Sequence, residues 1–188
     1  MTISTGRGDK GQTNTFGGGW IDKDDIRIEC LGSIDEFNST IGLLRAKLPD
    51  GHEWQQKLQK VQTDMMELMS HIATPSNQGL ENTKHKPTDG PRFCESWSFE
   101  LEKCMNEKSD WFLLPGGNEI SALCHVIRTQ VRRAERRLIS LKKEDKECVE
   151  EYIQKYINRL SDTFFLMARQ EMQNAGVKEE KWRRFRAK

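Results

Sequence analysis

Two arginines in the segment HVIRTQVRRAERR have the spacing needed to grip a polyanion. On a helix that turns about 100° per residue, Arg128 and Arg132 share one face with Glu135. Arg133 and Arg137 project across the helix from them. Two guanidinium groups one turn apart can hold a triphosphate through bidentate hydrogen bonds. A solvated, salt-bridged face is the alternative, but arginines that border an apolar stripe are expected to be half-buried and to need partners.

A second polar face occurs in the segment YINRLSDTFFLMAR. Asn158 and Asp162 lie four residues apart on the side opposite the apolar stripe that contains Leu160, with Phe165 and Arg169 one and two turns further on. A helix with polar and aromatic groups opposite its core face is covered by another subunit, by a ligand or by solvent. Spacing alone does not decide among the three.

The glycine-rich stretch GRGDKGQTNTFGGG comes within one residue of a phosphate-binding P-loop, with Gln12 at the position of the lysine. A P-loop joins a buried strand to a helix. No strand is expected before Gly6 and no helix for some twenty residues after it, so a P-loop fold is rejected. Glycine amides, Lys10 and the hydroxyls of Thr5 and Thr13 are nevertheless groups that bind phosphate. Taken alone, the stretch is equally consistent with an anion site and a flexible tail.

The composition argues against several classes of function. Hydrophobic residues make up 35% and charged residues 31% of the 188 residues, which suits one domain of amphipathic helices. The 30 basic residues barely outnumber the 29 acidic ones, so no nucleic-acid partner is expected. No apolar run approaches the ~20 residues that span a bilayer, and the N-terminus has no signal-peptide pattern, so no membrane segment is expected.

The cysteines and histidines argue against two further kinds of site, disulfide bonds and a protein-bound metal. The five cysteines form no CxxC pair and their number is odd, which favours free thiols in a reducing cytoplasm. The four histidines are scattered without metal-ligand spacing, so no protein-bound metal site is expected.

From residue 33 onward, apolar residues recur every three or four positions, which predicts amphipathic helices and no strand. We expect the first helix to begin at Ser33, where Ser33 and Glu36 match a capping box, and to end before Pro49. The remaining helices are expected at about residues 54–72, 93–104, 118–141 and 149–172. The pattern predicts an all-α, five-helix bundle with a ferritin-like up-and-down arrangement.

Five segments in this order resemble those of the PduO-type ATP:cob(I)alamin adenosyltransferases: TGRGDKGQT, DDIRIECLGSIDEFNSTIGLLRA, FLLPGG, HVIRTQVRRAERR and YINRLSDTFFLMAR. The resemblance extends from Thr5 to about Arg169, and RRAER combined with NRLSD is its most specific part. It implies a homotrimer with active sites between adjacent subunits. It also implies transfer of the 5′-deoxyadenosyl group of ATP to the cobalt of cob(I)alamin or a related corrinoid, with release of triphosphate and with Mg²⁺ present.

The resemblance also implies roles for individual residues. The N-terminal segment would line the nucleotide through Thr5, Gly8, Asp9, Lys10, Gly11, Gln12 and Thr13, with Lys10 on the phosphates. The neighbouring chain would complete the ATP site with Arg132, Glu135 and Asn158, beside which Asp162 supports the site. Asp35 would pair with Arg128 across the interface, and Phe112 would press on the lower face of the corrin.

These implications divide the chain into an ATP-binding loop (1–25), a helical bundle (26–175) and a tail (176–188) within a single domain (1–188). The stretch KEEKWRRFRAK within the tail is basic and contains Trp182 and Phe185. Packing on the corrinoid side and fraying are the alternatives for it, and fraying is expected. The family usually has Lys or Arg where this chain has Gly6, and Arg7 is expected to take over that role. An electron-donating reductase and an adenosylcobalamin-dependent acceptor enzyme are the expected partners. A module that binds adenosylcobalamin for delivery or sensing, with little turnover, is the alternative function.

Overall fold

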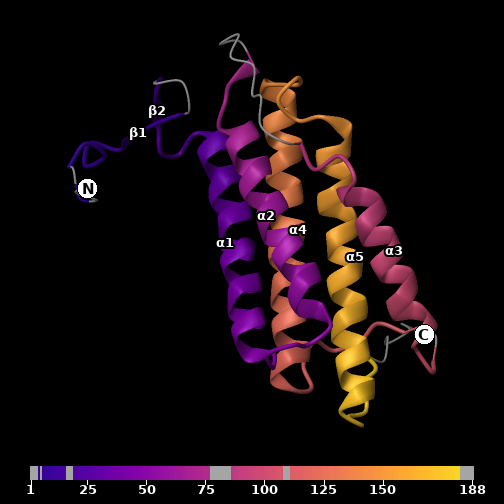
Figure 1. Cartoon of the computed structure of the whole chain (residues 1–188). Helices are drawn as coiled ribbons and strands as arrows, with labels where there is room; N and C mark the ends of the chain where they lie inside the picture. The colour runs from indigo at the N-terminus through magenta and orange to yellow at the C-terminus, as the bar shows by residue number, and fades with distance from the viewer. Residues whose placement is uncertain (1–3, 5, 16–18, 77–85, 108–110, 183–188) are drawn as a thin grey trace, which may run out of the picture.

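The computed structural model describes residues 4, 6–15, 19–76, 86–107 and 111–182, and its described part is dominated by five helices that alternate in direction (Figure 1). They are α1 (Ile26–Lys47), α2 (Trp54–Ile72), α3 (Gly90–Lys103), α4 (Glu119–Glu144) and α5 (Glu151–Asn174). Helix α4 packs on both α1 and α5, and α3 covers the other side of α5. The predicted five-helix fold is therefore confirmed. Within the described residues, no helix is long and apolar enough to cross a membrane.

The apolar stripes predicted from helical spacing form the core. The largest fully buried side chains include Phe37 of α1, Trp54 of α2, Trp97 of α3, and Tyr156 and Phe164 of α5. Each such side chain contributes roughly 1.5–3 kcal/mol through removal of apolar surface from water. Cys104, which the spacing placed in the α3 stripe, is exposed because α3 ends at Lys103.

Helix α1 begins seven residues before the predicted start. Asp25 is its N-cap, and the Asp25 carboxylate accepts a 2.7 Å hydrogen bond from the backbone amide of Arg27. The predicted capping box at Ser33 is wrong, because Ser33 lies inside the helix and its hydroxyl donates to the carbonyl of Glu29. A Ser-x-x-Glu pattern in mid-helix has no free backbone amides to satisfy.

The sequence predicted no strand before Gly6 or from residue 33 onward, and the structure adds a hairpin between these limits. In it, β1 (Gln12–Asn14) pairs antiparallel with β2 (Trp20–Asp22). Turns at Gly6 and Gly11, with φ of 67° and 84°, precede β1. The Gln12 side chain donates a 3.0 Å hydrogen bond to Asp22 across the hairpin. The residue at the P-loop lysine position therefore belongs to a strand, which supports rejection of a P-loop fold.

A buried ion pair joins the start of α1 to the end of α4. Arg27 donates to Asp145 at 2.6 Å and to the carbonyl of Ile72 at 2.5 Å. Burial by itself would raise the pKa of Asp145, but hydrogen bonds from Ser76, Arg27 and the Cys148 amide lower it to about 2. The carboxylate thus stabilises the folded chain only while it is ionised.

Replacement of Asp145 by Asn should remove part of the acid sensitivity of folding. The folded-state pKa lies below the ordinary value of 3.8, so the contribution is present above that value and is lost as pH falls from about 4 toward 2. Between pH 5 and 2, the free energy of unfolding should therefore fall by about 2 kcal/mol more for the wild type than for Asp145→Asn. Urea denaturation across this pH range measures the difference, and parallel pH profiles would contradict it.

Candidate functional site

A cavity of about 940 Å³ opens among α3, α4 and α5. Its lining includes Arg128 and Arg132 of α4 together with Arg159, Asp162 and Phe165 of α5. The predicted faces of α4 and α5 therefore meet in one depression. Arg133 and Arg137 point elsewhere, as predicted, and form ion pairs with Glu36 and Glu29 of α1.

The two cavity arginines of α4 have no acidic partner within the described part of the chain. Neither Arg128 nor Arg132 forms an ion pair with any residue that the structure describes. Arg128 is half-buried and its Nε has no hydrogen-bond partner among those residues. Burial, followed by the charge of neighbouring Arg132, lowers the pKa of Arg128. An anion bound between the two guanidinium groups would relieve both effects.

A hydrogen-bonded pair at the edge of the cavity joins α4 to α5. Asn158 Nδ2 donates to Glu135 Oε1 at 2.9 Å, which brings together two of the predicted site residues. Arg159 donates to Asn158 Oδ1 at 3.2 Å and lies 3.5 Å from Asp162. Glu135 and Arg159 therefore hold the Asn158 side chain in one orientation.

Arg159 was not among the predicted residues, although it lies beside Asn158 in sequence and bonds to it. Its guanidinium also lies 3.2 Å from Glu95 of α3. The α3 side of the cavity, with Glu95, Ser98 and Phe99, was missed as well. The apolar pattern of residues 93–104 is weak, and it did not indicate that the polar side of this helix faces α5.

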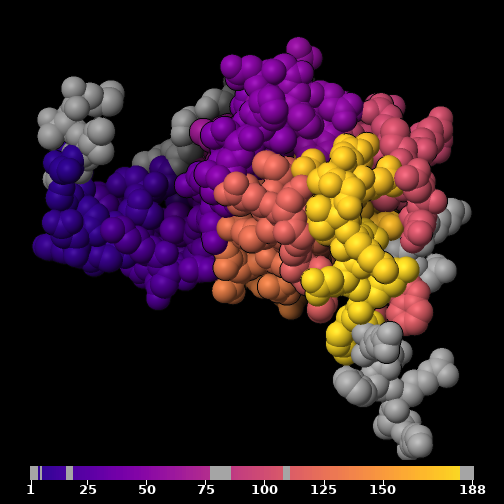
Figure 2. All heavy atoms as spheres, turned by 90° about the horizontal axis from the view of Figure 1, so that it is seen from below, coloured from indigo at the N-terminus to yellow at the C-terminus, as the bar shows by residue number. Residues whose placement is uncertain are grey.

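The structure does not bring the N-terminal residues to this cavity. The hairpin stands clear of the bundle on the side of α1, whereas α3 and α5 form the opposite side (Figures 1 and 2). The residues that the resemblance placed on the nucleotide, Gly8, Asp9, Lys10, Gly11, Gln12 and Thr13, are all in this N-terminal region. Thr5 lies outside the described residues. Asp35 is exposed on α1 and contacts none of the described residues through a hydrogen bond or ion pair.

Phe112 lies at the opposite end of the molecule, in the segment before α4, with 73% of its surface exposed. Leu113 pairs with Lys181 in an antiparallel bridge, so the C-terminal segment packs on this loop. The prediction that this segment frays is wrong for residues 178–182, and residues 183–188 lie outside the described part. Fraying was expected because a basic sequence shows no apolar period, but backbone pairing does not require one.

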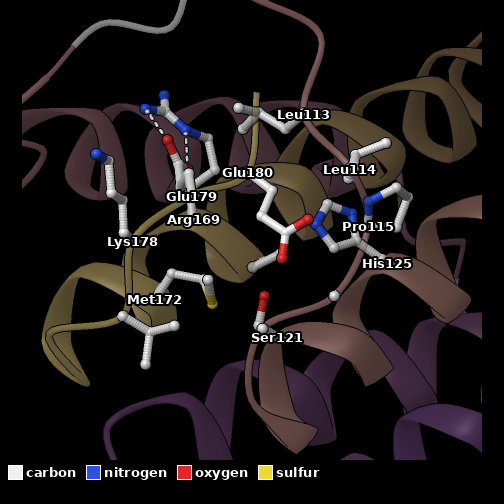
Figure 3. A pocket seen from close by; sticks show the side chains of 14 residues that line it. Leu113, Leu114, Pro115, Ser121, His125, Arg169, Met172, Lys178, Glu179 and Glu180 are labelled. Carbon is white, nitrogen blue, oxygen red and sulfur yellow. Dashed lines mark hydrogen bonds and ion pairs between the residues drawn. The ribbon is translucent and has the colours of Figure 1, made fainter. Parts of the chain in front are cut away.

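A second cavity, of about 250 Å³, lies behind the Phe112 loop (Figure 3). Leu113, Leu114 and Pro115 form one wall, and residues 177–180 form another. Ser121 and His125 reach it from α4, and their Oγ and Nδ1 atoms have no hydrogen-bond partner in the described chain. Burial, followed by the charge of Arg128, lowers the pKa of His125, which favours the neutral ring.

Comparison with known proteins agrees with this fold and identifies the family. The chain belongs to the cobalamin adenosyltransferase family, whose model matches residues 3–171. A corrinoid adenosyltransferase of Bacillus subtilis is 35% identical over 192 residues, which cover 98% of this chain and 93% of that protein. A human corrinoid adenosyltransferase is 34% identical over 185 residues, which cover 95% and 72% of the two chains.

Solved structures of the same family superimpose closely. A variant PduO-type ATP:corrinoid adenosyltransferase from Lactobacillus reuteri, complexed with cobalamin and ATP, matches with a TM-score of 0.90 and 28% identity. The match covers 97% of this chain and 100% of that one. A second variant from the same organism, complexed with ATP, matches with a TM-score of 0.87 and 29% identity over 97% and 100% of the chains.

Inorganic triphosphate should bind at the paired arginines, and Arg132→Ala should weaken that binding roughly ten- to a hundredfold. The reason is the loss of charge-assisted hydrogen bonds, each worth about 1.5–3 kcal/mol. Calorimetric titration measures the dissociation constant. Arg137→Ala is the matched control, because Arg137 lies on the same helix but points toward Glu29. Equal weakening in both variants would mean that only net charge matters.

Proposed function

We propose that this protein is an ATP:corrinoid adenosyltransferase, which transfers the 5′-deoxyadenosyl group of ATP to the cobalt of cob(I)alamin or a related corrinoid and releases triphosphate. The family match covers most of the chain, and its relatives of known activity are corrinoid adenosyltransferases. The observation on this chain that carries the proposal is a pair of arginines, Arg128 and Arg132, that line a cavity of about 940 Å³ and form no ion pair within the described residues, with Arg128 Nε also lacking a hydrogen-bond partner there. The product of this reaction, triphosphate, is the anion that such a pair suits.

The reaction needs little acid–base help. Cobalt(I) is a strong nucleophile that attacks C5′ of the ribose, and the C5′–O bond to the triphosphate breaks as the Co–C bond forms. The enzyme must align these atoms and neutralise the charge that develops on the leaving group. In this proposal Arg132 and Lys10 supply positive charge at the triphosphate. Glu135 and Asn158, already bonded to each other, hold the nucleoside part.

Mg²⁺ is the proposed metal partner of the triphosphate. Within the described residues, no three His, Cys, Asp or Glu side chains lie close enough to hold a metal ion. The ion would therefore enter as Mg-ATP, held chiefly by phosphate oxygens and water, which is how Mg²⁺ commonly binds to nucleotides in proteins. Asp9 and Asp162 are the carboxylates that the proposed site would offer to this ion.

A homotrimer is the proposed assembly, with each site shared by two chains. Within one chain the hairpin stands on the side of α1, away from α3 and α5, whose residues line the cavity with Arg132 (Figure 1). This separation supports a site in which Lys10 of one chain meets Arg132 of another. Asp35 and Arg128 support the same arrangement, because both lack a charged partner among the described residues of their own chain. A salt bridge between Asp35 and Arg128 of adjacent chains would satisfy both groups.

Mixing two inactive variants should restore activity if the sites are shared. Lys10→Ala removes the loop charge and Arg132→Ala removes the helix charge, so each homotrimer should lose transfer activity. In trimers formed randomly from equal amounts of both chains, about one quarter of the interfaces combine two intact halves. Coexpression followed by assay of adenosylcobalamin formation should therefore give about one quarter of wild-type activity. No restoration, with trimers still present by sedimentation, would place both residues in one chain's site.

Phe112 has the proposed role of excluding the axial ligand from the lower face of the corrin. Cobalt(II) with an axial base resists reduction, and a four-coordinate cobalt accepts an electron more easily. An exposed aromatic ring is suited to cover a flat apolar macrocycle. A reductase that donates the electron and an enzyme that uses the product are the proposed partners. The five free cysteines suit a cytoplasmic location.

Replacement of Phe112 by Ala should slow transfer most when cobalt(II) is reduced in place. With chemically pre-reduced cob(I)alamin, the loss should be roughly tenfold smaller, because no axial ligand then has to be removed. Parallel assays with the two oxidation states, under anaerobic conditions, measure the ratio. Equal losses with both substrates would contradict the axial-ligand role.

The proposed activity is tested by incubation with Mg-ATP and pre-reduced cobalamin in the absence of oxygen. Absorbance bands of adenosylcobalamin should appear and triphosphate should accumulate in equal amount. If adenosylcobalamin bound tightly but never formed, the delivery or sensor function would replace this proposal. If neither ATP nor cobalamin raised the unfolding temperature, the site would hold neither ligand.

A further inference from the structure

The loop that carries Phe112 is held by the C-terminal segment as well as by the bundle. The amide of Trp182 donates to the carbonyl of Phe112 at 2.8 Å, and the amide of Leu114 donates to the carbonyl of Glu180 at 2.8 Å. These bonds flank the antiparallel bridge of Leu113 to Lys181. Residues 112–114 therefore form a short two-stranded ribbon with residues 180–182.

The side chains of this ribbon add a contact at Phe112, the residue with a proposed role at the corrin. The rings of Phe112 and Trp182 meet edge to face, with centroids 6.1 Å apart and planes at 77°. This is a favourable geometry for an aromatic pair. Because Phe112 is 73% exposed, its contact with Trp182 is well placed to fix the orientation of the ring.

A buried ion pair anchors the C-terminal segment to α5. Arg169 is 9% exposed and donates to both carboxylate oxygens of Glu179, at 2.7 and 3.2 Å (Figure 3). Arg169 Nη2 also donates to the carbonyl of Glu107 at 3.0 Å. A buried, bidentate Arg–carboxylate pair has one geometry, so it sets where the chain leaves α5. Arg169 lines both the cavity of about 940 Å³ among α3, α4 and α5, called the arginine cavity below, and the smaller cavity behind the Phe112 loop.

We propose that Trp182 is a positioning residue for Phe112, and that the segment Val177–Trp182, anchored by Arg169 and Glu179, is a brace that presents the Phe112 ring to the corrin. The inference rests on the proposed function and assigns a role to a segment outside residues 3–171 that match the family. Without the brace, Phe112 would retain its chemistry but lose its fixed orientation. The step that suffers is displacement of the axial ligand, since it needs the ring in one place.

Three variants and one control test the brace. Trp182→Ala removes the ring contact, Trp182→Phe keeps an aromatic group, and Glu179→Gln weakens the anchor. Lys181→Ala is the matched control, because it alters the same segment while leaving both the Trp182 ring and the Arg169–Glu179 pair in place. Lys181 itself lies 4.0 Å from Glu107, which is a weak contact.

The first readout is spectroscopic. With Mg-ATP and cob(II)alamin bound, Trp182→Ala should lower the fraction of four-coordinate cobalt(II) and the transfer rate from cobalt(II) roughly two- to tenfold, the range that corresponds to an aromatic pair. Transfer from pre-reduced cob(I)alamin should stay within about twofold. Trp182→Phe should restore most of the loss, Glu179→Gln should reproduce it in part, and Lys181→Ala should behave as wild type.

A double variant separates action through Phe112 from direct contact with the corrinoid. In a Phe112→Ala background, Trp182→Ala should cause no further loss, because a positioning residue has nothing left to position. An additive loss, or an equal loss with both oxidation states of cobalt, would overturn the proposal in favour of a direct contact or a folding defect.

The second readout does not depend on activity. Amide hydrogen exchange of Leu114 should accelerate in Trp182→Ala and in Glu179→Gln relative to Lys181→Ala, because its acceptor, the carbonyl of Glu180, would no longer be held. Unchanged exchange would overturn the brace even if the enzyme were active. Absence of adenosylcobalamin from the wild type, with accelerated exchange in the variants, would refute the proposed function and leave the brace as a structural fact.

Discussion

The arrangement of the site depends on two neighbouring positive charges that have no negative partner among the described residues. Arg128 and Arg132 lie one turn apart on α4, and Arg128 is half-buried with its Nε unpartnered among the described residues. A buried guanidinium without an acid is costly, and a second positive charge beside it increases the cost. Negative charge supplied from outside the described chain would offset this cost. A triphosphate on one side and a carboxylate from another subunit on the other would meet that need.

The positions of the remaining site residues follow from the same requirement. Asn158 and Glu135 are bonded across α4 and α5, so the polar edge of the cavity is ordered before any ligand arrives. The loop with Lys10 is attached to the far side of the bundle through α1. In the proposed homotrimer, a site divided in this way would form only on assembly, which would tie catalysis to the oligomer.

The two ends of the molecule serve different parts of the reaction in this proposal. At one end, the N-terminal hairpin brings amides and a lysine to the phosphates. At the other end, Phe112 is exposed to the corrin and is steadied by Trp182 through ring contact and backbone pairing. Arg169 lies between them, lining the arginine cavity while it anchors the C-terminal segment. Charge at one end and apolar surface at the other match a substrate pair made of a polyphosphate and a macrocycle.

The sequence by itself determined the helices, their buried faces and the polar faces of α4 and α5 that meet, because helical periodicity is a local property of the order of residues along the chain. It also identified the family through segments such as RRAER and NRLSD. It misplaced the start of α1, since Ser33 and Glu36 match a cap in pattern but lie where the backbone amides are already bonded. Only the tertiary structure decided that Gln12 belongs to a hairpin, that Arg128 lacks an acid within the described chain, and that Trp182 packs on Phe112. The hairpin is a local pairing in a stretch without an alternating apolar pattern, whereas the other two depend on contacts between segments far apart in the chain, which no local spacing encodes.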